Sequence, residues 1–150
     1  MDLPVQRQVP FLFVGNQACL DFINTDLVMN GQPTDLLPSL QDLVAWLLQA
    51  GLMTKELAKR LEKEGSRHGA ETLKQAKVFR TTMREMAERL AAGKSVPQAA
   101  LDAVNEALRY RVGYPQVGRQ NGAFERTYQQ EFTDSDQLLG LLAEAASDLD

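Results

Sequence analysis

Apolar residues recur at helical spacing through most of this chain, and this feature limits its fold most strongly. In the longest such segment, about residues 70–92, they return every three or four positions on one face. Other segments share this period, and several are bounded by helix start and stop signals. The predicted helices are about residues 17–28, 40–50, 54–64, 70–92, 97–108 and 135–149.

The period changes to strand-like alternation in residues 110–114 and again in residues 124–132. Asn121-Gly122 lies between these two runs and is typical of a two-residue β-hairpin turn. A short apolar run at residues 11–14 predicts a further strand at the edge of this sheet. The predicted fold class is therefore α+β and mainly helical, with about six helices and a small antiparallel β-hairpin or sheet.

Length and composition indicate one domain over residues 1–150, with 44% hydrophobic and 24% charged residues. The net charge of −4 argues against DNA binding by these residues alone, because DNA-binding domains usually carry a basic excess. A single cysteine, Cys19, excludes an internal disulfide and a cysteine-rich zinc site within the chain. No apolar run is long enough for a signal peptide or a membrane span, so we expect a cytoplasmic protein.

Polar residues interrupt the apolar faces of three predicted helices. They are Asp21, Asn24 and Thr25 in the first helix, Arg80 and Arg84 in the longest helix, and Asn105 in the helix that follows. A buried guanidinium keeps its charge and needs acceptors, ideally a carboxylate in bidentate geometry. We therefore expect Asp21 to pair with Arg80, and Asn24 and Asn105 to complete the hydrogen bonds.

Two interpretations of this polar cluster remain open at the level of sequence. It either fixes how the helices pack, or it lines a pocket in which polar groups converge on a small ligand. Other candidates are weaker: we expect Cys19 to be a buried apolar residue and His68 to lie exposed in a loop. The sequence contains no glycine-rich phosphate loop and no catalytic triad ordering, and we predict that the chain is not an enzyme.

Residues 11–16, Phe-Leu-Phe-Val-Gly-Asn, and residues 19–25, Cys-Leu-Asp-Phe-Ile-Asn-Thr, resemble the opening of the ABATE-domain family. The second motif is the more distinctive of the two. The similarity covers nearly all of the chain and continues, in order, through residues 36–39, 43–47, 79–80, 105–108 and 142–146.

This resemblance implies a stress-induced bacterial transcription regulator, in which such a domain precedes a C-terminal zinc finger with a Cys-Gly-Asn-Arg motif. The sequence departs from that pattern because it stops at Asp150 without the finger. We expect the helix at about residues 135–149 to lead toward the finger. Zinc and DNA binding would then belong to the missing finger, and we expect no cofactor in this chain.

Our first hypothesis is a ligand-sensing, regulatory domain that binds an unknown small molecule. The ligand-binding residues would be Asp21, Asn24, Thr25, Arg80, Arg84 and Asn105. The alternative is a scaffold that forms a homodimer or docks a partner without any ligand. The exposed aromatic residues of the hairpin would then be the contact surface, namely Tyr110, Tyr114 and Tyr128.

Overall fold

The computed structural model describes residue 11 and residues 17–64, 69–111, 113–130 and 135–149. Within these ranges the chain forms six α-helices and two antiparallel two-stranded sheets, which confirms the α+β, mainly helical class. The helices are α1 (Ala18–Ile23), α2 (Leu40–Gln49), α3 (Lys55–Glu64), α4 (Gly69–Ala91), α5 (Gln98–Leu108) and α6 (Leu138–Ser147), the last preceded by the 3₁₀ turn η1 (Ser135–Gln137). The strands are β1 (Asp26–Met29), β2 (Gln32–Asp35), β3 (Gly113–Gln120) and β4 (Ala123–Gln130).

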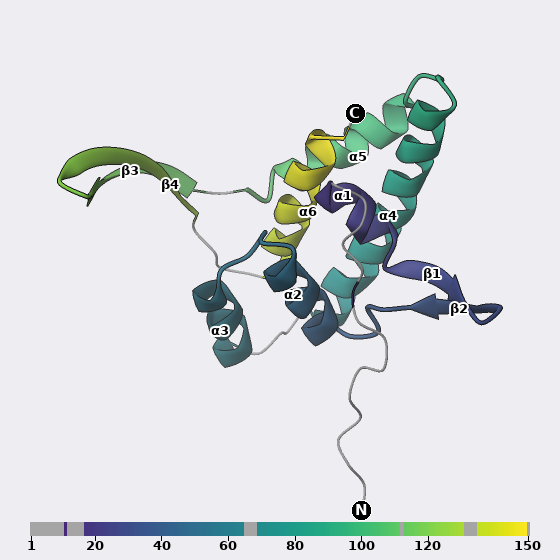
Figure 1. The fold of residues 1–150 in the computed structure, drawn as a ribbon, viewed down its shortest axis with the longest axis horizontal. Helices are drawn as coiled ribbons and strands as arrows, with labels where there is room; N and C mark the ends of the chain where they lie inside the picture. Colours follow the sequence, from purple (N-terminus) through teal and green to yellow (C-terminus); the bar gives the residue numbers. More distant parts are fainter. Residues whose placement is uncertain (1–10, 12–16, 65–68, 112, 131–134, 150) are drawn as a thin grey trace, which may run out of the picture.

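Helices α4 and α6 form the centre of the helical body, and α1, α2 and α5 pack around them (Figure 1). The sequence of α6 is apolar on nearly every side, and its residues Leu138, Leu142 and Ala143 are at most 2% exposed. A helix that is hydrophobic all round belongs in a core. The C-terminal helix is thus a central element of this domain.

The ends of the middle helices follow their sequence signals. The Ser39 hydroxyl accepts a hydrogen bond from the Asp42 backbone N–H at 3.2 Å and caps α2. Gly51, with φ of +76°, follows the end of that helix in the left-handed conformation that glycine adopts without strain. Thr54 caps α3 by accepting from the Leu57 N–H at 3.2 Å. The predictions for α2 and α3 are confirmed.

The first predicted helix, residues 17–28, is wrong in its second half. Helix α1 ends at Ile23, and the chain then forms the β1–β2 hairpin. Asn30 and Gly31 make its turn with φ of +52° and +78°, the geometry that Asn-Gly favours in two-residue hairpins. The sequence thus contained a second turn signal of the kind recognised at Asn121-Gly122.

The predicted C-terminal hairpin is confirmed as strands β3 and β4, joined by Asn121 and Gly122 with φ of +52° and +79°. It begins at Gly113 rather than at Tyr110, which lies in a turn after α5. The hairpin projects away from the helical body (Figure 1). The strand predicted at residues 11–14 lies, except for the buried Phe11, outside the described residues.

Candidate functional site

Arg80 is the buried charge around which the polar cluster is built. It lies on α4 within the apolar face and is 5% exposed. Its Nη1 donates to Asp35 Oδ1 at 3.0 Å, and its Nη2 donates to Asp35 Oδ2 at 2.8 Å. Such a bidentate pair satisfies both the charge and the planar geometry of a guanidinium. The prediction that Arg80 faces inward toward a carboxylate is confirmed.

Thr25 connects this pair to the end of α1. Its hydroxyl accepts from Arg80 Nη1 at 3.0 Å and donates to the Phe22 carbonyl at 2.6 Å. Its own carbonyl accepts from the Leu36 N–H at 2.8 Å, just beyond β2. A threonine hydroxyl both donates and accepts, so Thr25 can join the guanidinium to the backbone.

Two arginines of α4 hold two carboxylates of the β1–β2 hairpin. Asp26 and Asp35 are directly opposite one another across the two strands, where like charges would destabilise the pairing. Arg80 neutralises Asp35, and Arg84, one helical turn later, forms an ion pair with Asp26 at 3.5 Å. Arg80 and Arg84, four residues apart on α4, therefore each face one carboxylate of this cross-strand pair.

Arg84 also closes the end of α1. Its Nη2 donates to the Ile23 carbonyl at 2.9 Å and to the Asp26 carbonyl at 2.7 Å. The last carbonyls of a helix lack partners within it and are satisfied by side chains or water. The two arginines together thus fix the short helix α1 and the β1–β2 hairpin against α4.

Asp35 stays ionised because of its partners. Burial by itself raises the pKa of this carboxyl group, but hydrogen bonds from Arg80, from the Leu37 N–H and from Lys77, together with the charge of Arg80, lower the pKa to about 2. The Lys77 ammonium lies 3.2 Å from Asp35 Oδ2. Arg80, Asp35 and Lys77 therefore form one salt-bridged network.

The low pKa of Asp35 makes the protein sensitive to acid. The pKa of about 2 in the folded state is below the ordinary value of 3.8 for an aspartate, so ionised Asp35 stabilises the fold above about pH 4 and loses this effect as the pH falls toward 2. We expect this contribution to be roughly 1–2 kcal/mol, because the carboxylate is partly exposed. Urea unfolding at pH 7, 4 and 2.5 should show a smaller loss in Asp35→Asn than in the wild type. Equal losses in both proteins would contradict the assignment.

The structure corrects two predictions about the first polar face. Asp21 is 6% exposed, as expected of an inward-facing residue, but the carboxylate that pairs with Arg80 is Asp35. Asn24, which we expected to face Arg80, is exposed. It is the C-cap residue of α1, at the point where the chain leaves the helix for the β1–β2 hairpin.

Asn105 was also placed wrongly. The buried face of α5 consists of Ala100, Val104 and Ala107, whereas Asn105 is exposed and Leu101 is 41% exposed. The predicted face, which used the leucines, is rotated by about 70° from the buried face, and Val104 belongs to both. Asn105 therefore does not contribute to the cluster around Arg80.

Asp35 is the cluster residue that the sequence interpretation missed. It belonged to no predicted helix or strand, and nothing in the helical periodicity connects it with α4. The Asn30-Gly31 turn was the available signal, because a two-residue hairpin around it returns residue 35 to the neighbourhood of residues 25 and 26.

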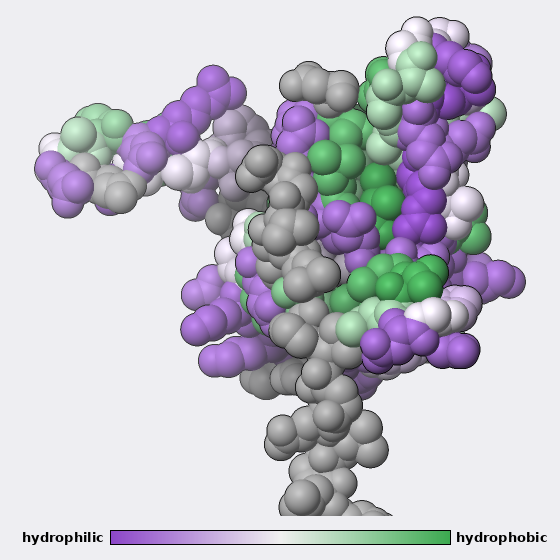
Figure 2. Space-filling view, turned by 45° about the vertical axis from the view of Figure 1, so that its right-hand side comes forward, coloured by the Kyte–Doolittle hydropathy of each residue, from purple (hydrophilic) through white to green (hydrophobic). Residues whose placement is uncertain are grey.

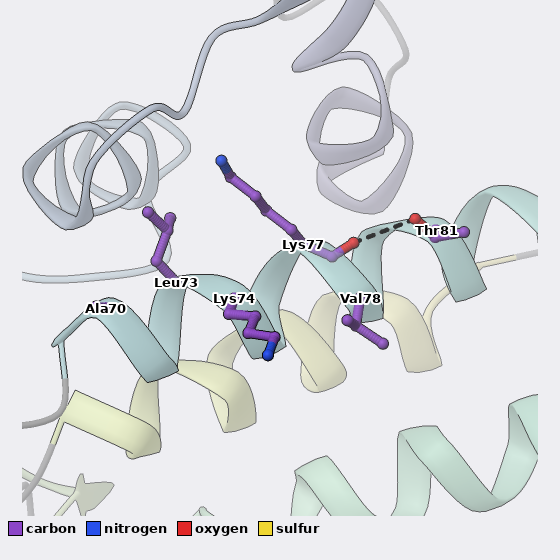
Figure 3. Close-up of a pocket in the computed structure, with 6 residues that line it drawn as sticks. All are labelled: Ala70, Leu73, Lys74, Lys77, Val78 and Thr81. Atoms are coloured by element: carbon purple, nitrogen blue, oxygen red, sulfur yellow. Dashed lines mark hydrogen bonds between the residues drawn. The ribbon is translucent and has the colours of Figure 1, made fainter.

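A surface groove of about 430 Å³ runs along the first part of α4, and its lining residues are Ala70, Leu73, Lys74, Lys77, Val78 and Thr81. Figure 3 shows Leu73 and Lys77 projecting from one side of the helix and Lys74 and Val78 from the other. Lys77 connects the groove with the cluster through its ion pair with Asp35. None of the six predicted ligand-binding residues lines this groove.

Among other candidates, Cys19 is 2% exposed, and burial raises the pKa of its thiol to about 11. It is therefore a buried apolar residue rather than a nucleophile, as predicted. His68 lies outside the described residues. Among the described residues, no group of three or more His, Cys, Asp or Glu side chains could hold a metal ion. No helix in the same ranges is long and apolar enough to cross a bilayer.

These features define a mainly helical α+β domain in which one long helix anchors a small β-hairpin through two arginines. Residues 16–150 match the model of the ABATE family, whose description is "Putative stress-induced transcription regulator". The chain belongs to this family, and the resemblance inferred from its motifs is confirmed. No curated protein and no solved structure matches the chain.

Proposed function

We propose that the chain is the ligand-sensing, regulatory domain of a transcription regulator, and that its ligand is a small molecule with an anionic group. The ligand would bind in the groove along α4, with its charge near Lys77 and Lys74 and its apolar part near Leu73 and Val78. The observation that carries this proposal is the position of Lys77, which lines the groove and also reaches Asp35. DNA and zinc would be bound outside these residues.

The bonds of Arg80 favour Lys77 over Arg80 as the group that meets the ligand. The Arg80 guanidinium donates to Asp35 and Thr25 and has a side chain that is only 6% exposed. The Lys77 side chain is 34% exposed. If Lys77 moves away, Asp35 still forms its ion pair with Arg80. An anion can therefore compete for Lys77 without leaving a buried charge unpaired.

Both ends of the groove region are bonded to other elements. Near one end, the Thr72 hydroxyl lies 2.9 Å from the Ser135 hydroxyl at the start of η1, directly before α6. Near the other end, Lys77 and Arg80 hold Asp35 at the end of β2. A ligand would act by binding two arrangements of these contacts with unequal affinity.

Thermal unfolding with paired probes tests this proposal. Benzoate and benzamide have similar shapes, but only benzoate carries a negative charge. At ten times its dissociation constant, benzoate should stabilise the protein by about 1.4 kcal/mol, which corresponds to a rise in Tm of about 3–6 °C. Benzamide should produce a much smaller rise, because it lacks the charge that Lys77 would bind.

Lys77→Met should remove the benzoate effect while leaving the fold intact. Lys94→Met is the matched control, since Lys94 is exposed beyond the end of α4 and does not line the groove. A benzoate shift that survives Lys77→Met would count against the groove, and so would equal shifts with benzoate and benzamide. Arg80→Leu is unsuitable for this test, because it would break the buried ion pair and the fold with it.

A further inference from the structure

The β3–β4 hairpin, residues 113–130, has two chemically different faces, and we call it the arm. Side chains alternate between faces along a strand, and residues directly opposite each other share a face. The pairs Pro115–Tyr128, Val117–Arg126 and Arg119–Phe124 form one face, which is apolar and basic. The only acidic residue of the arm, Glu125, pairs with Gly118 on the other face.

This apolar and basic face is exposed. Phe124 is 78% exposed, Val117 67% and Tyr128 51%. Figure 2 shows the arm reaching away from the body, with hydrophobic residues among hydrophilic ones. An isolated two-stranded hairpin is marginally stable in water, and exposed apolar side chains on such an element are typical of contact surfaces.

A second groove, of about 340 Å³, lies between α4 and α5. Its lining includes Phe79, Ala107 and Leu139, together with Val78, which is 62% exposed. Glu106 lines the same groove and is exposed, and its carboxylate has no ion pair or hydrogen bond among the described residues. An aromatic side chain can therefore pack against the apolar lining of the groove, and a cation can pair with the carboxylate of Glu106.

The groove lies at the base of the arm, because Tyr110 lines it and β3 begins three residues later. Each strand of the arm has eight residues and so extends about 26 Å at ~3.3 Å per residue. A two-fold axis through the middle of the arm would place the tip of each arm at the base of the other. Both contacts then form at once, as an isologous dimer requires.

The geometry points to a second copy of this chain as the partner of the arm. Phe124 of one copy binds in the α4–α5 groove of the other, and Arg119, which lies over the Phe124 ring at 5.7 Å, pairs with Glu106 there. The contact is reciprocal. It goes beyond ligand sensing, because Lys77 does not line the α4–α5 groove and Val78 is the one residue that lines both grooves.

Charge favours this partner. The arm carries Arg119 and Arg126 against Glu125, a net charge of +1, so the rest of the chain carries −5. The body of a second copy therefore attracts the arm over a distance. A nucleic acid would meet the same two arginines, but the acidic body at the base of the arm would repel it.

Sedimentation equilibrium of the full chain at several concentrations tests the dimer. We expect the wild type to be dimeric, and we expect Phe124→Ser to raise the dissociation constant at least about tenfold. Arg119→Glu and Glu106→Arg should each weaken the dimer, and the two combined should restore most of the affinity. Gln116→Glu places a charge on the opposite face of the arm and should change little.

A monomeric wild type at the highest concentrations would overturn the proposal. A dimer that persists in both Phe124→Ser and Glu106→Arg would overturn it too, because the contact would then lie elsewhere. Loss of the dimer in Phe124→Ser but not in Glu106→Arg would exclude the α4–α5 groove. Binding of duplex DNA by a monomer, lost in Arg119→Glu, would identify the arm as a nucleic-acid contact instead.

Discussion

Replacing Asp35 with alanine is expected to lower the free energy of unfolding by about 3–5 kcal/mol. The substitution leaves the Arg80 guanidinium buried, with the Thr25 hydroxyl as its one remaining partner among the described residues. It also removes the acceptor for the Leu37 N–H at 2.9 Å. Urea unfolding at pH 7, followed by circular dichroism, measures the loss directly.

Asp26→Ala is the matched control, because Asp26 lies opposite Asp35 in the same hairpin and also pairs with an arginine of α4. That ion pair is longer, at 3.5 Å, and both side chains are about two-fifths exposed, so its loss should cost no more than about 1 kcal/mol. Adding Arg80→Met to Asp35→Ala should recover part of the stability, because no buried charge is then left unpaired. Similar small losses for Asp35→Ala and Asp26→Ala would show that burial does not strengthen the Arg80 pair.

The local elements were predictable because their signals are local. The long apolar period of α4, the Ser39 cap, Gly51 and the Asn121-Gly122 turn each depend on residues a few positions apart. Arg80 was also identified correctly as buried, since its place within an apolar stripe follows from the helical period alone.

The partner of Arg80 was not predictable by the same reasoning. The chain has 20 acidic residues, and helical spacing ranks none of them as the partner of a given arginine. Asp21 was favoured because it lies on an apolar helix. Asp35 reaches Arg80 through the β1–β2 hairpin, and the predicted helix, residues 17–28, wrongly included the start of that hairpin. An error at the end of α1 thus became an error in the site.

The face of α5 shows a different limit. Leu101, Val104 and Leu108 form an apolar stripe, and so do Ala100, Val104 and Ala107, whose centre lies about 70° away. Leucine is the more hydrophobic residue, so periodicity favours the first stripe, but the structure buries the second. The small alanine side chains allow α5 to approach α6 closely, which is a property of the helix pair rather than of α5 alone.

Trp46→Ala is expected to cost about 3–5 kcal/mol, the usual range for removing a large buried aromatic side chain. Trp46 is fully buried on α2, and its ring lies 5.3 Å from the Phe22 ring on α1. Helix α1 has only six residues and is too short to be stable without packing. Loss of Trp46 should therefore also loosen the end of α1 that Arg84 holds, and amide hydrogen exchange of α1 would reveal this.

Circular dichroism is the suitable measurement for this series, because Trp46 is the only tryptophan and its substitution removes the fluorescence signal. Trp46→Phe should lose less stability than Trp46→Ala, since a ring still faces Phe22. Val78→Ala removes apolar atoms from a residue that is 62% exposed and should change stability by no more than about 0.5 kcal/mol. A small loss of stability in Trp46→Ala would mean that the arginines of α4, rather than Trp46, hold α1 in place. Amide hydrogen exchange of α1 should then be faster in Arg84→Ala than in Trp46→Ala.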